Sequence, residues 1–353
     1  MNSKYKNSVS SLILLIILIF AIFYNKNKKE NLKSINDYLS LQGIAQGTTY
    51  NIQYEDKEKR DFHIEIIEIF KNFDKAVSTY IPESEISRFN SSKEVYFNYD
   101  YFYPLLKKTK EVFEKTDGAF DPTIAPLVNA YGFGPIERKH APSQAKIDSL
   151  LQFVNFNSII FDSLHATKNK MQIELDFNGI AQGYSVDVLV DFLRKKNINN
   201  FLIEIGGEVY AEGKNPKGQL WQIGIEKPSE DPKEQKYFQA IFALQNEGLV
   251  TSGNYRKFYI ENGVKYSHTI SPYTGKPVRH SLLSASVFAP DCITADAYAT
   301  SFMVLGMEKT KKIVEETPEL NVFLVYADKN GNFKTYLSEG AKDKVIYLNN
   351  IAN

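Results

Sequence analysis

The fold is decided most directly by the stretch Asp176-Phe177-Asn178-Gly179-Ile180-Ala181-Gln182-Gly183-Tyr184-Ser185-Val186-Asp187. It runs from a predicted strand at 171–177, through an Asn-Gly turn signal, into a predicted helix at 181–196 with apolar residues at helical spacing. Such a turn exposes backbone groups, and the N-terminus of the following helix favours anionic ligands. A tight structural connection would leave the same pattern, so both interpretations stand at this point.

Outward from this stretch, strand and helix patterns mix without strict alternation, which predicts an α+β fold of mixed sheets and helices in a single domain. The helix pattern recurs at 62–77, at 101–115, after Pro142, from near Ile293 and from Lys309. The strand pattern occurs at 47–54, 158–161, 201–205, 221–225, 238–244, 249–251, 266–270, 283–288, 322–326 and 333–337. The segment 226–236, rich in proline and charge, is predicted to be a surface loop.

Composition narrows the function classes. The 353 residues include 42 Lys plus Arg and 42 Asp plus Glu, so the formal net charge is zero. A nucleic-acid surface would show a basic excess, and we therefore expect no nucleic-acid partner. Cys292 is the single cysteine, so no internal disulfide can form.

The N-terminus is expected to lie outside the fold. Lys4 and Lys6 precede an apolar run at 12–23, and a lysine-rich stretch follows at 25–29. This pattern predicts a signal peptide or membrane anchor over 1–25, a polar stem over 26–41 and the functional domain over 42–345. Positive charge on both flanks leaves the orientation of an anchor open.

A second informative stretch is Thr294-Ala295-Asp296-Ala297-Tyr298-Ala299-Thr300-Ser301, which has a helical composition. Asp296 and Thr300 are four residues apart and so share one helix face, about 6 Å apart along the axis. Two hard oxygen ligands and few others suit Mg²⁺, which keeps waters and recruits phosphate oxygens. Chance also places Asp and Thr on one face in many helices, so this pair is only a candidate metal site.

Four further segments combine special backbone demands with exposed polar groups, as binding loops do. They lie at 78–90, 118–127, 251–256 and 268–275.

With these segments in this order, the chain from Gly47 to about Gly306 resembles the FAD:protein FMN transferases, also called the ApbE family. The resemblance implies an ApbE-like, T-fold-related domain. It implies an enzyme that splits the FAD pyrophosphate, attaches FMN by a phosphoester bond to a threonine of a target protein and releases AMP. It also implies Mg²⁺ dependence and a place in the bacterial cell envelope, on the periplasmic side of the inner membrane, either secreted or associated with the membrane through the N-terminal segment.

The resemblance also implies site residues. Asp296, Thr300 and the backbone carbonyl of Gly179 match the family's metal ligands, with Asp296 catalytic. His268 matches a histidine needed for activity; it is our candidate base for the acceptor hydroxyl, although it could instead only fix a loop. The positions that match flavin-nucleotide contacts are Gln46, Tyr80, Ala119, Phe120, Asp121, Asp176, Gln182 and Ile270.

Two positions depart from the family pattern. Gln182 replaces a common lysine, and Ser271 replaces the usual aspartate before proline. Neither change removes a proposed metal ligand, so both bear on affinity more than on reaction class. Two other functions stay open: an FAD pyrophosphatase giving FMN and AMP, and a non-catalytic flavin-binding protein of the envelope.

Overall fold

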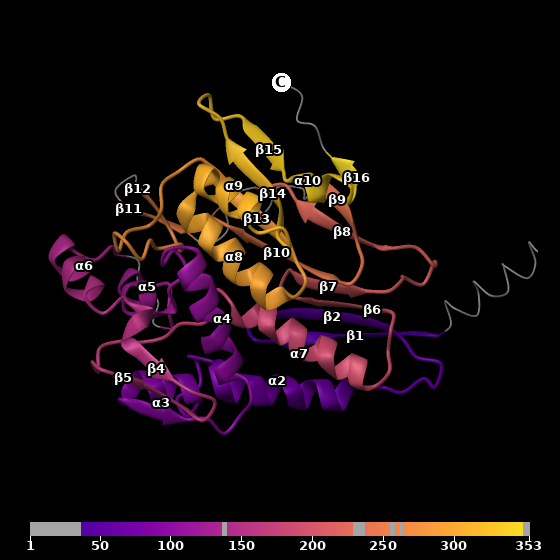
Figure 1. Cartoon of the computed structure of the whole chain (residues 1–353), viewed down its shortest axis with the longest axis horizontal. Coiled ribbons are helices and arrows are strands. Elements are labelled where there is room, and N and C mark those ends of the chain that lie inside the picture. The colour runs from indigo at the N-terminus through magenta and orange to yellow at the C-terminus, as the bar shows by residue number, and fades with distance from the viewer. Residues whose placement is uncertain (1–36, 136–139, 229–236, 255–257, 262–263, 349–353) are drawn as a thin grey trace, which may run out of the picture.

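The centre of the fold is an eight-stranded sheet. The computed structural model describes residues 37–135, 140–228, 237–254, 258–261 and 264–348. Every neighbouring pair of strands in the sheet is antiparallel. In spatial order the strands are β1 (Tyr38–Ala45), β2 (Thr48–Glu55), β6 (Phe201–Ile205), β7 (Glu208–Glu212), β10 (Glu247–Gly253), β13 (Leu282–Ala289), β14 (Asn321–Ala327) and β15 (Phe333–Leu337) (Figure 1).

Four longer helices contribute to the main core on one side of this sheet: α2 (His63–Val77), α4 (Phe102–Lys115), α7 (Ala181–Lys195) and α8 (Cys292–Leu305). The helix α8 is apolar nearly all round, and most of its side chains are buried. A helix of this kind belongs inside a protein, with no solvent face. A charged residue on α8, such as Asp296, is therefore forced into the interior.

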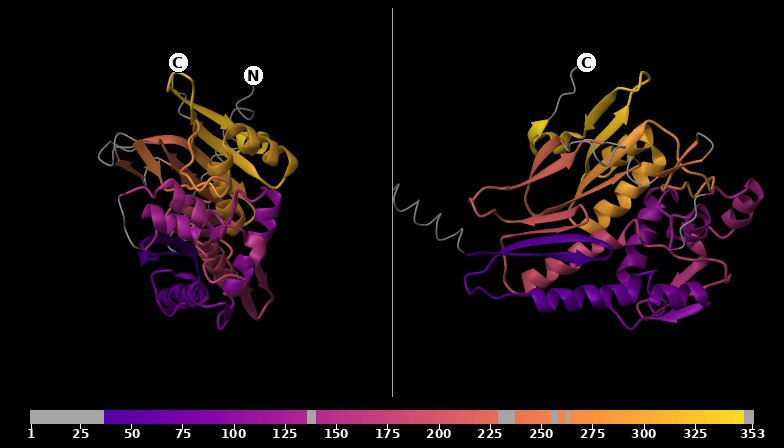
Figure 2. Two further views of the ribbon diagram at one scale, coloured as in Figure 1. Left: turned by 90° about the vertical axis from the view of Figure 1, so that its left-hand side faces the viewer. Right: turned by 180° about the vertical axis from the view of Figure 1, so that it is seen from behind.

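A smaller sheet covers the opposite side of the central sheet. It consists of β16 (Val345–Leu348), β9 (Phe238–Leu244) and β8 (Trp221–Glu226). The Phe242 ring lies 5.0 Å from that of Phe288 and 5.4 Å from that of Phe323, centroid to centroid. In Figure 1, α2 and α7 lie below β1 and β2, and the strands β8, β9 and β16 of the smaller sheet lie above them; the view from behind in Figure 2 shows the same arrangement. The molecule therefore has three layers.

Shorter elements complete the fold. They are α3 (Glu85–Ser91), β3 (Glu94–Tyr96), α5 (Ala125–Tyr131), α6 (Gln144–Leu151), β4 (Ile159–Phe161), β5 (His165–Lys168), β11 (Phe258–Glu261), β12 (Val264–Ser267), α9 (Met307–Glu316) and α10 (Glu339–Lys342). Strands β3, β5 and β4 form a separate three-stranded sheet, and β11 and β12 form a two-stranded one.

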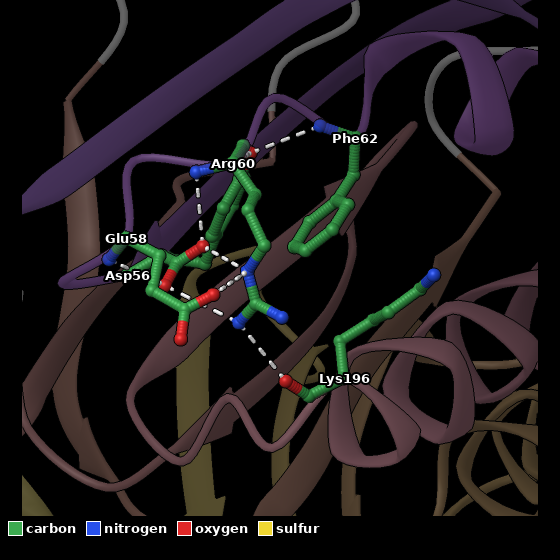
Figure 3. Close-up of polar contacts among 6 residues, drawn as sticks. Asp56, Glu58, Arg60, Phe62 and Lys196 are labelled. Carbon is green, nitrogen blue, oxygen red and sulfur yellow. Dashed lines mark hydrogen bonds and ion pairs between the residues drawn. The ribbon is translucent and has the colours of Figure 1, made fainter.

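The C-terminal end of α7 is fixed by the loop between β2 and α2 (Figure 3). The Arg60 guanidinium donates to the backbone carbonyl of Lys196 at 3.1 Å and to Asp56 through Nε, at 2.8 Å, and through Nη2. It also lies 5.3 Å from the ring centroid of Phe62. Orphan carbonyls at a helix C-terminus accept hydrogen bonds from basic side chains in this way.

The α+β prediction is confirmed, but several details of it are wrong. The strand predicted at 171–177 does not form, because Leu175 bonds to a side chain where a neighbouring strand would lie: its N–H donates to Asn90 Oδ1 at 2.7 Å, and its carbonyl accepts from Asn90 Nδ2 at 2.9 Å. The loops predicted at 78–90 and 118–127 contain the short helices α3 and α5. Strands β1, β3, β5, β7, β11 and β16 were not predicted.

The predicted domain boundaries also need correction. Strand β1 begins at Tyr38 and pairs with β2, so the end of the predicted stem at 26–41 already belongs to the sheet. At the other end β16 continues past 345 to Leu348. The signal or anchor predicted at 1–25 lies outside the described residues. Within those that are described, no helix is long and apolar enough to span a bilayer.

Candidate active site

Gly179, which precedes α7, lies against Thr300 on α8. A β-carbon added at Gly179 would sit 2.9 Å from Thr300 Oγ1, 3.0 Å from Thr300 Cγ2 and 3.3 Å from the ring of Phe120. Contacts below 3.0 Å are ones that a real side chain would have to relieve by movement. A side chain here would therefore displace Thr300, and its absence leaves the backbone of this turn open to the Thr300 hydroxyl.

One helical turn earlier on α8, Asp296 meets the first turn of α7. The N–H of Gly183 donates to Asp296 Oδ2 at 3.0 Å. The carboxylate is 4% exposed and forms no ion pair with any described residue. Burial raises the pKa of Asp296 to about 7, and the bond from Gly183 acts in the opposite direction. A nearby cation would favour its charged form.

The approach of α7 to α8 at this point depends on Gly183. A β-carbon there would lie 2.3 Å from the carbonyl oxygen of Cys292 and 2.7 Å from Cβ of Asp296. Any side chain would push the helices apart, so glycine is the residue that lets its own N–H reach the carboxylate.

The N-terminus of α8 is closed by two aspartates. Asp187 on α7 accepts from the N–H groups of Cys292 at 2.8 Å and Ile293 at 2.7 Å, and Asp291 accepts from Thr294 N–H at 3.0 Å. These bonds satisfy three of the four unpaired N–H groups of a helix start. Burial raises the pKa of Asp187 to about 8, which the N–H of Cys292 opposes and the charge of Asp291 reinforces.

The segment leading to Asp176 is anchored by α3. Besides the two bonds of Asn90 to Leu175, the buried ammonium group of Lys168 donates to the carbonyls of Asn90 at 3.0 Å and Ile173 at 2.6 Å. Burial lowers the pKa of Lys168 to about 8. Asp176 itself accepts from Asn178 N–H at 2.7 Å and donates its own N–H to the carbonyl of Pro122 at 2.9 Å. The turn at Gly179 is thus held close to the 119–121 segment.

In that segment the side chain of Asp121 forms its hydrogen bonds within the protein. Its carboxylate accepts from the N–H and hydroxyl groups of Thr123, at 2.8 and 2.5 Å, and from the N–H of Phe156 at 3.1 Å. Burial raises the pKa of Asp121 to about 6, and these bonds counteract the rise. Ala119 and Phe120 are buried beside it, so any contribution of Asp121 to a ligand would come through the position of the 119–121 run.

His268 and Ile270 lie on a loop that docks on α5. Ile270 is buried with Leu127, Tyr131 and Ile147, and the His268 ring meets that of Phe133 edge-on at 6.4 Å. The next turn is closed by the residue that departs from the family pattern.

Ser271 Oγ accepts from Tyr273 N–H at 3.3 Å, as an aspartate would in an Asx-turn. The Tyr273 hydroxyl donates to the carbonyls of Thr116 at 3.2 Å and Asp117 at 3.1 Å. The turn at Ser271 therefore contacts the residues that directly precede the 119–121 run in the chain. Ser271 keeps the turn that an aspartate at this position would form.

Two glutamines tie hairpin tips to α7. Gln46, in the β1–β2 turn, donates to Ser185 Oγ at 2.7 Å, and Gln182 donates to the carbonyl of Ile205, at the end of β6, at 2.9 Å. Gly206 (φ 65°) leaves the space that the Gln182 amide occupies. Gln182 is the second residue that departs from the family pattern, and its amide is directed to the β6–β7 turn.

The described contacts do not bring Tyr80 to the other predicted residues; its side chain is 65% exposed in the turn before α3. Arg88 lies 3.8 Å from Glu85, an ion pair within α3. Sequence reasoning missed Asp187 and Asn90. Asp187 ended a quoted motif, but its partners are more than 100 residues away in the chain.

In this arrangement two packed helices bring one buried carboxylate, Asp296, and one hydroxyl, Thr300, to the start of α7. The family model described as "ApbE family" matches residues 46–324, and the chain belongs to this family. The recognition made from the motifs is therefore confirmed.

Relatives with established names agree. The FAD:protein FMN transferase of Haemophilus influenzae is 36% identical over 306 residues, which cover 83% of this chain and 88% of that protein. The protein of the same name from Escherichia coli K12 is 32% identical over 77% of this chain and 78% of its own length.

Solved structures agree as well. The flavin transferase ApbE of Vibrio cholerae superposes with a TM-score of 0.78 at 33% identity, covering 87% of this chain and 99% of that one. The apo form of the Pseudomonas stutzeri flavinyl transferase ApbE gives the same TM-score at 31% identity, with 87% and 96% covered.

Proposed function

We propose that this protein is a Mg²⁺-dependent FAD:protein FMN transferase. It cleaves FAD, joins the FMN part by a phosphoester bond to a threonine of a target protein and releases AMP. Flavin transfer is the activity for which the relatives are named. The cation, the acceptor threonine and the release of AMP are our own steps beyond those names.

The observation that carries the proposal is a pair of neighbouring contacts between α8 and the start of α7. Thr300 lies against Gly179, and Asp296, one helical turn earlier on α8, accepts from the N–H of Gly183. The donor set fits Mg²⁺: one buried carboxylate, one hydroxyl and an open backbone turn supply oxygen only, and Mg²⁺ usually completes its shell with water and substrate phosphates. In the described part of the chain no group of three or more His, Cys, Asp or Glu side chains is placed to hold a metal. A soft or fully protein-coordinated metal is thus disfavoured.

Asp296, Thr300 and the Gly179 carbonyl would hold the cation, which when bound supplies charge neutralisation for the diphosphate. The chain's own residues do the rest. Gly183 N–H holds one oxygen of Asp296, so the carboxylate cannot rotate freely. The threonine oxygen of the acceptor forms a bond to the FMN phosphorus, the bond to the AMP oxygen breaks, and His268 accepts the hydroxyl proton.

Nucleotide contacts would come from Gln46, Tyr80, the 119–121 run, Asp176, Gln182 and Ile270, as the family resemblance implies. The structure suggests different contributions from each. Phe120 adjoins Gly179 and could meet the ligand directly, whereas Gln182 would act by holding the β6–β7 turn against α7.

The decisive experiment follows flavin and AMP together. Purified protein is incubated with FAD in Mg²⁺ or EDTA, with and without a candidate acceptor, then resolved on a denaturing gel by flavin fluorescence while AMP is quantified. With the acceptor present, we expect a fluorescent acceptor band in Mg²⁺ but not in EDTA. The amount of AMP released should equal the amount of flavin attached to the acceptor. Release of FMN and AMP without an acceptor would indicate a pyrophosphatase, and FAD that stays intact for hours would indicate a binding protein.

A variant separates the two roles of His268. If it is the base, His268→Asn should slow transfer and remove a neutral-pH limb from the rate profile, since an ordinary imidazole titrates near pH 6.5. Full rate with an unchanged profile would show that His268 only supports its loop.

We also propose that the N-terminal segment places the enzyme in the bacterial envelope on the periplasmic side, anchored or secreted. The support is the apolar run at 12–23 with its lysine flanks. Fractionation of the full chain, with mass determination of its mature N-terminus, tests this placement.

A further inference from the structure

Three contacts between α7 and α8 form a regular ladder. Going from Gly179 to Gly183 to Asp187 advances four residues at a time toward the C-terminus of α7. Their partners Thr300, Asp296 and Cys292 go back four residues at a time along α8. The two helices therefore run in opposite directions, and each contact is one helical turn from the next.

The outer contacts of the ladder differ in kind. The Gly179–Thr300 contact is purely steric. It would therefore allow one helix to slide slightly along the other. At the opposite end, Asp187 grips two consecutive N–H groups at 2.7 and 2.8 Å, a geometry that tolerates little displacement. The middle contact, from Gly183 to Asp296, depends on the register that this grip sets.

Two carboxylates thus cross between the helices in opposite senses: Asp187 of α7 binds the start of α8, and Asp296 of α8 binds the first turn of α7. Asp187 forms no ion pair with a described residue. Its partners are backbone N–H groups at the positive end of α8, and burial makes their loss costly.

We propose that Asp187 is a positioning residue that sets the register of α8 against α7 and thereby keeps Asp296 opposite Gly183 and Thr300 opposite Gly179. Its consequence for the cation rests on the proposed function. The register itself is a property of the chain alone.

Asp291 provides a matched control. Both aspartates cap α8, but the Asp291 side chain accepts from Thr294 within its own helix, so its loss removes a cap without cutting a tie to α7. Asp187→Ala, Asp187→Asn and Asp291→Ala are compared with the wild type. Asp187→Asn retains one acceptor oxygen and serves as the milder change.

The first measurement is amide hydrogen exchange of the segment that contains Gly183, in metal-free full-length protein. We expect exchange about tenfold faster in Asp187→Ala, a smaller increase in Asp187→Asn, and near wild-type exchange in Asp291→Ala. The second is the Mg²⁺ concentration that half-saturates the shift in melting temperature. It should rise about tenfold in Asp187→Ala and change little in Asp291→Ala.

Equal exchange in Asp187→Ala and Asp291→Ala would overturn the proposal, and so would wild-type exchange in both Asp187 variants. If Asp187→Ala does not fold, Asp187→Asn decides by the same comparison. If the wild type shows no Mg²⁺ effect but the exchange difference is found, the metal part of the proposed function fails while the positioning role stands.

Discussion

The two ends of α7 treat buried negative charge in opposite ways. At the C-terminal end, Asp56 is 4% exposed and paired with Arg60, which also binds the last carbonyl of the helix (Figure 3). At the N-terminal end, Asp296 is also 4% exposed, but it faces a backbone N–H and forms no ion pair among the described residues. One end is neutralised within the chain. At the other end, no described side chain offsets the negative charge that Asp296 carries once it is deprotonated, and a ligand cation could neutralise it.

The pKa values express this difference. For Asp56, burial acts to raise the pKa, but hydrogen bonds from the Arg60 side chain and from backbone N–H groups outweigh it, so the pKa falls below its ordinary value. For Asp296 and Asp187, burial prevails and raises the pKa to about 7 and about 8. Asp56 lies in a surface loop within reach of a guanidinium, whereas the other two lie between helices. This difference supports our proposal that the N-terminal end of α7 is the functional end.

Removing the charge at the functional end should have the largest effect. We expect Asp296→Ala to lower FAD turnover in Mg²⁺ by roughly two orders of magnitude or more, the scale of one lost electrostatic stabiliser. Steady-state release of AMP measures this loss, and the melting temperature of the metal-free variant checks that it folds. Native turnover by a folded Asp296→Ala protein would show that the metal assignment is wrong.

The second prediction concerns pH, where the two ends should differ in sign. Asp296 and Asp187 hold protons in the folded state that the unfolded chain has released, so the metal-free protein should lose stability as pH rises from about 4 through 7 to 8. We expect the free energy of unfolding to fall by about 2 to 3 kcal/mol between pH 5 and 8, less than the ideal value because the protein relaxes and solvent enters. Asp56, with its lowered pKa, contributes stability that is lost only on acidification below about pH 4.

Urea unfolding in EDTA at several pH values measures this dependence. Mg²⁺ should restore stability at pH 8 and have little effect at pH 5, because protonated carboxyls bind the cation poorly. Stability that rises from pH 5 to 8 without metal would contradict the assignment of uncompensated carboxylates to the functional end.

Much of the local geometry of the candidate site could be predicted because it depends on local spacing. The four-residue interval from Asp296 to Thr300 and the glycine turn at Gly179 are visible in the sequence, and both occur where expected. What could not be predicted depends on contacts between distant segments. Asp187 binds N–H groups 105 and 106 residues away, and Asn90 replaces a strand partner for Leu175 across 85 residues. No periodic pattern encodes such side-chain-to-backbone bonds.

The directions in which the side chains point could not be predicted from the sequence either. Asp121 matches a position that contacts the flavin nucleotide in the family, yet its carboxylate already accepts hydrogen bonds from Thr123 and Phe156. Gln182 stands where a charge could meet phosphate, yet its amide reaches Ile205. A sequence position indicates which residue is near a site, while burial and competing partners decide what its side chain does.

The third prediction tests the C-terminal end of α7, where Arg60 neutralises Asp56. Asp56→Ala removes the partner of Arg60 and two acceptors for backbone N–H groups, so we expect about 2 kcal/mol of destabilisation with FAD turnover unchanged at 25 °C. Chemical unfolding and turnover are measured on the same preparation. Lys59→Ala is the control, since its exposed ion pair with Asp37 at 3.4 Å should contribute less than about 1 kcal/mol. A loss of activity in Asp56→Ala beyond its loss of folded protein would mean that the two ends of α7 are coupled.

The smallest expected effect comes from one methyl group at the functional end. Gly179→Ala places a β-carbon 2.9 Å from Thr300 Oγ1 and 3.0 Å from Cγ2, so the hydroxyl must move, and we expect about a tenfold loss of turnover with little change in stability. Thr300→Ser in the same chain removes the Cγ2 contact while keeping the hydroxyl, and should recover part of the loss. If the second change recovers nothing, crowding of Thr300 is not the cause, and the loss must come from the backbone of the turn.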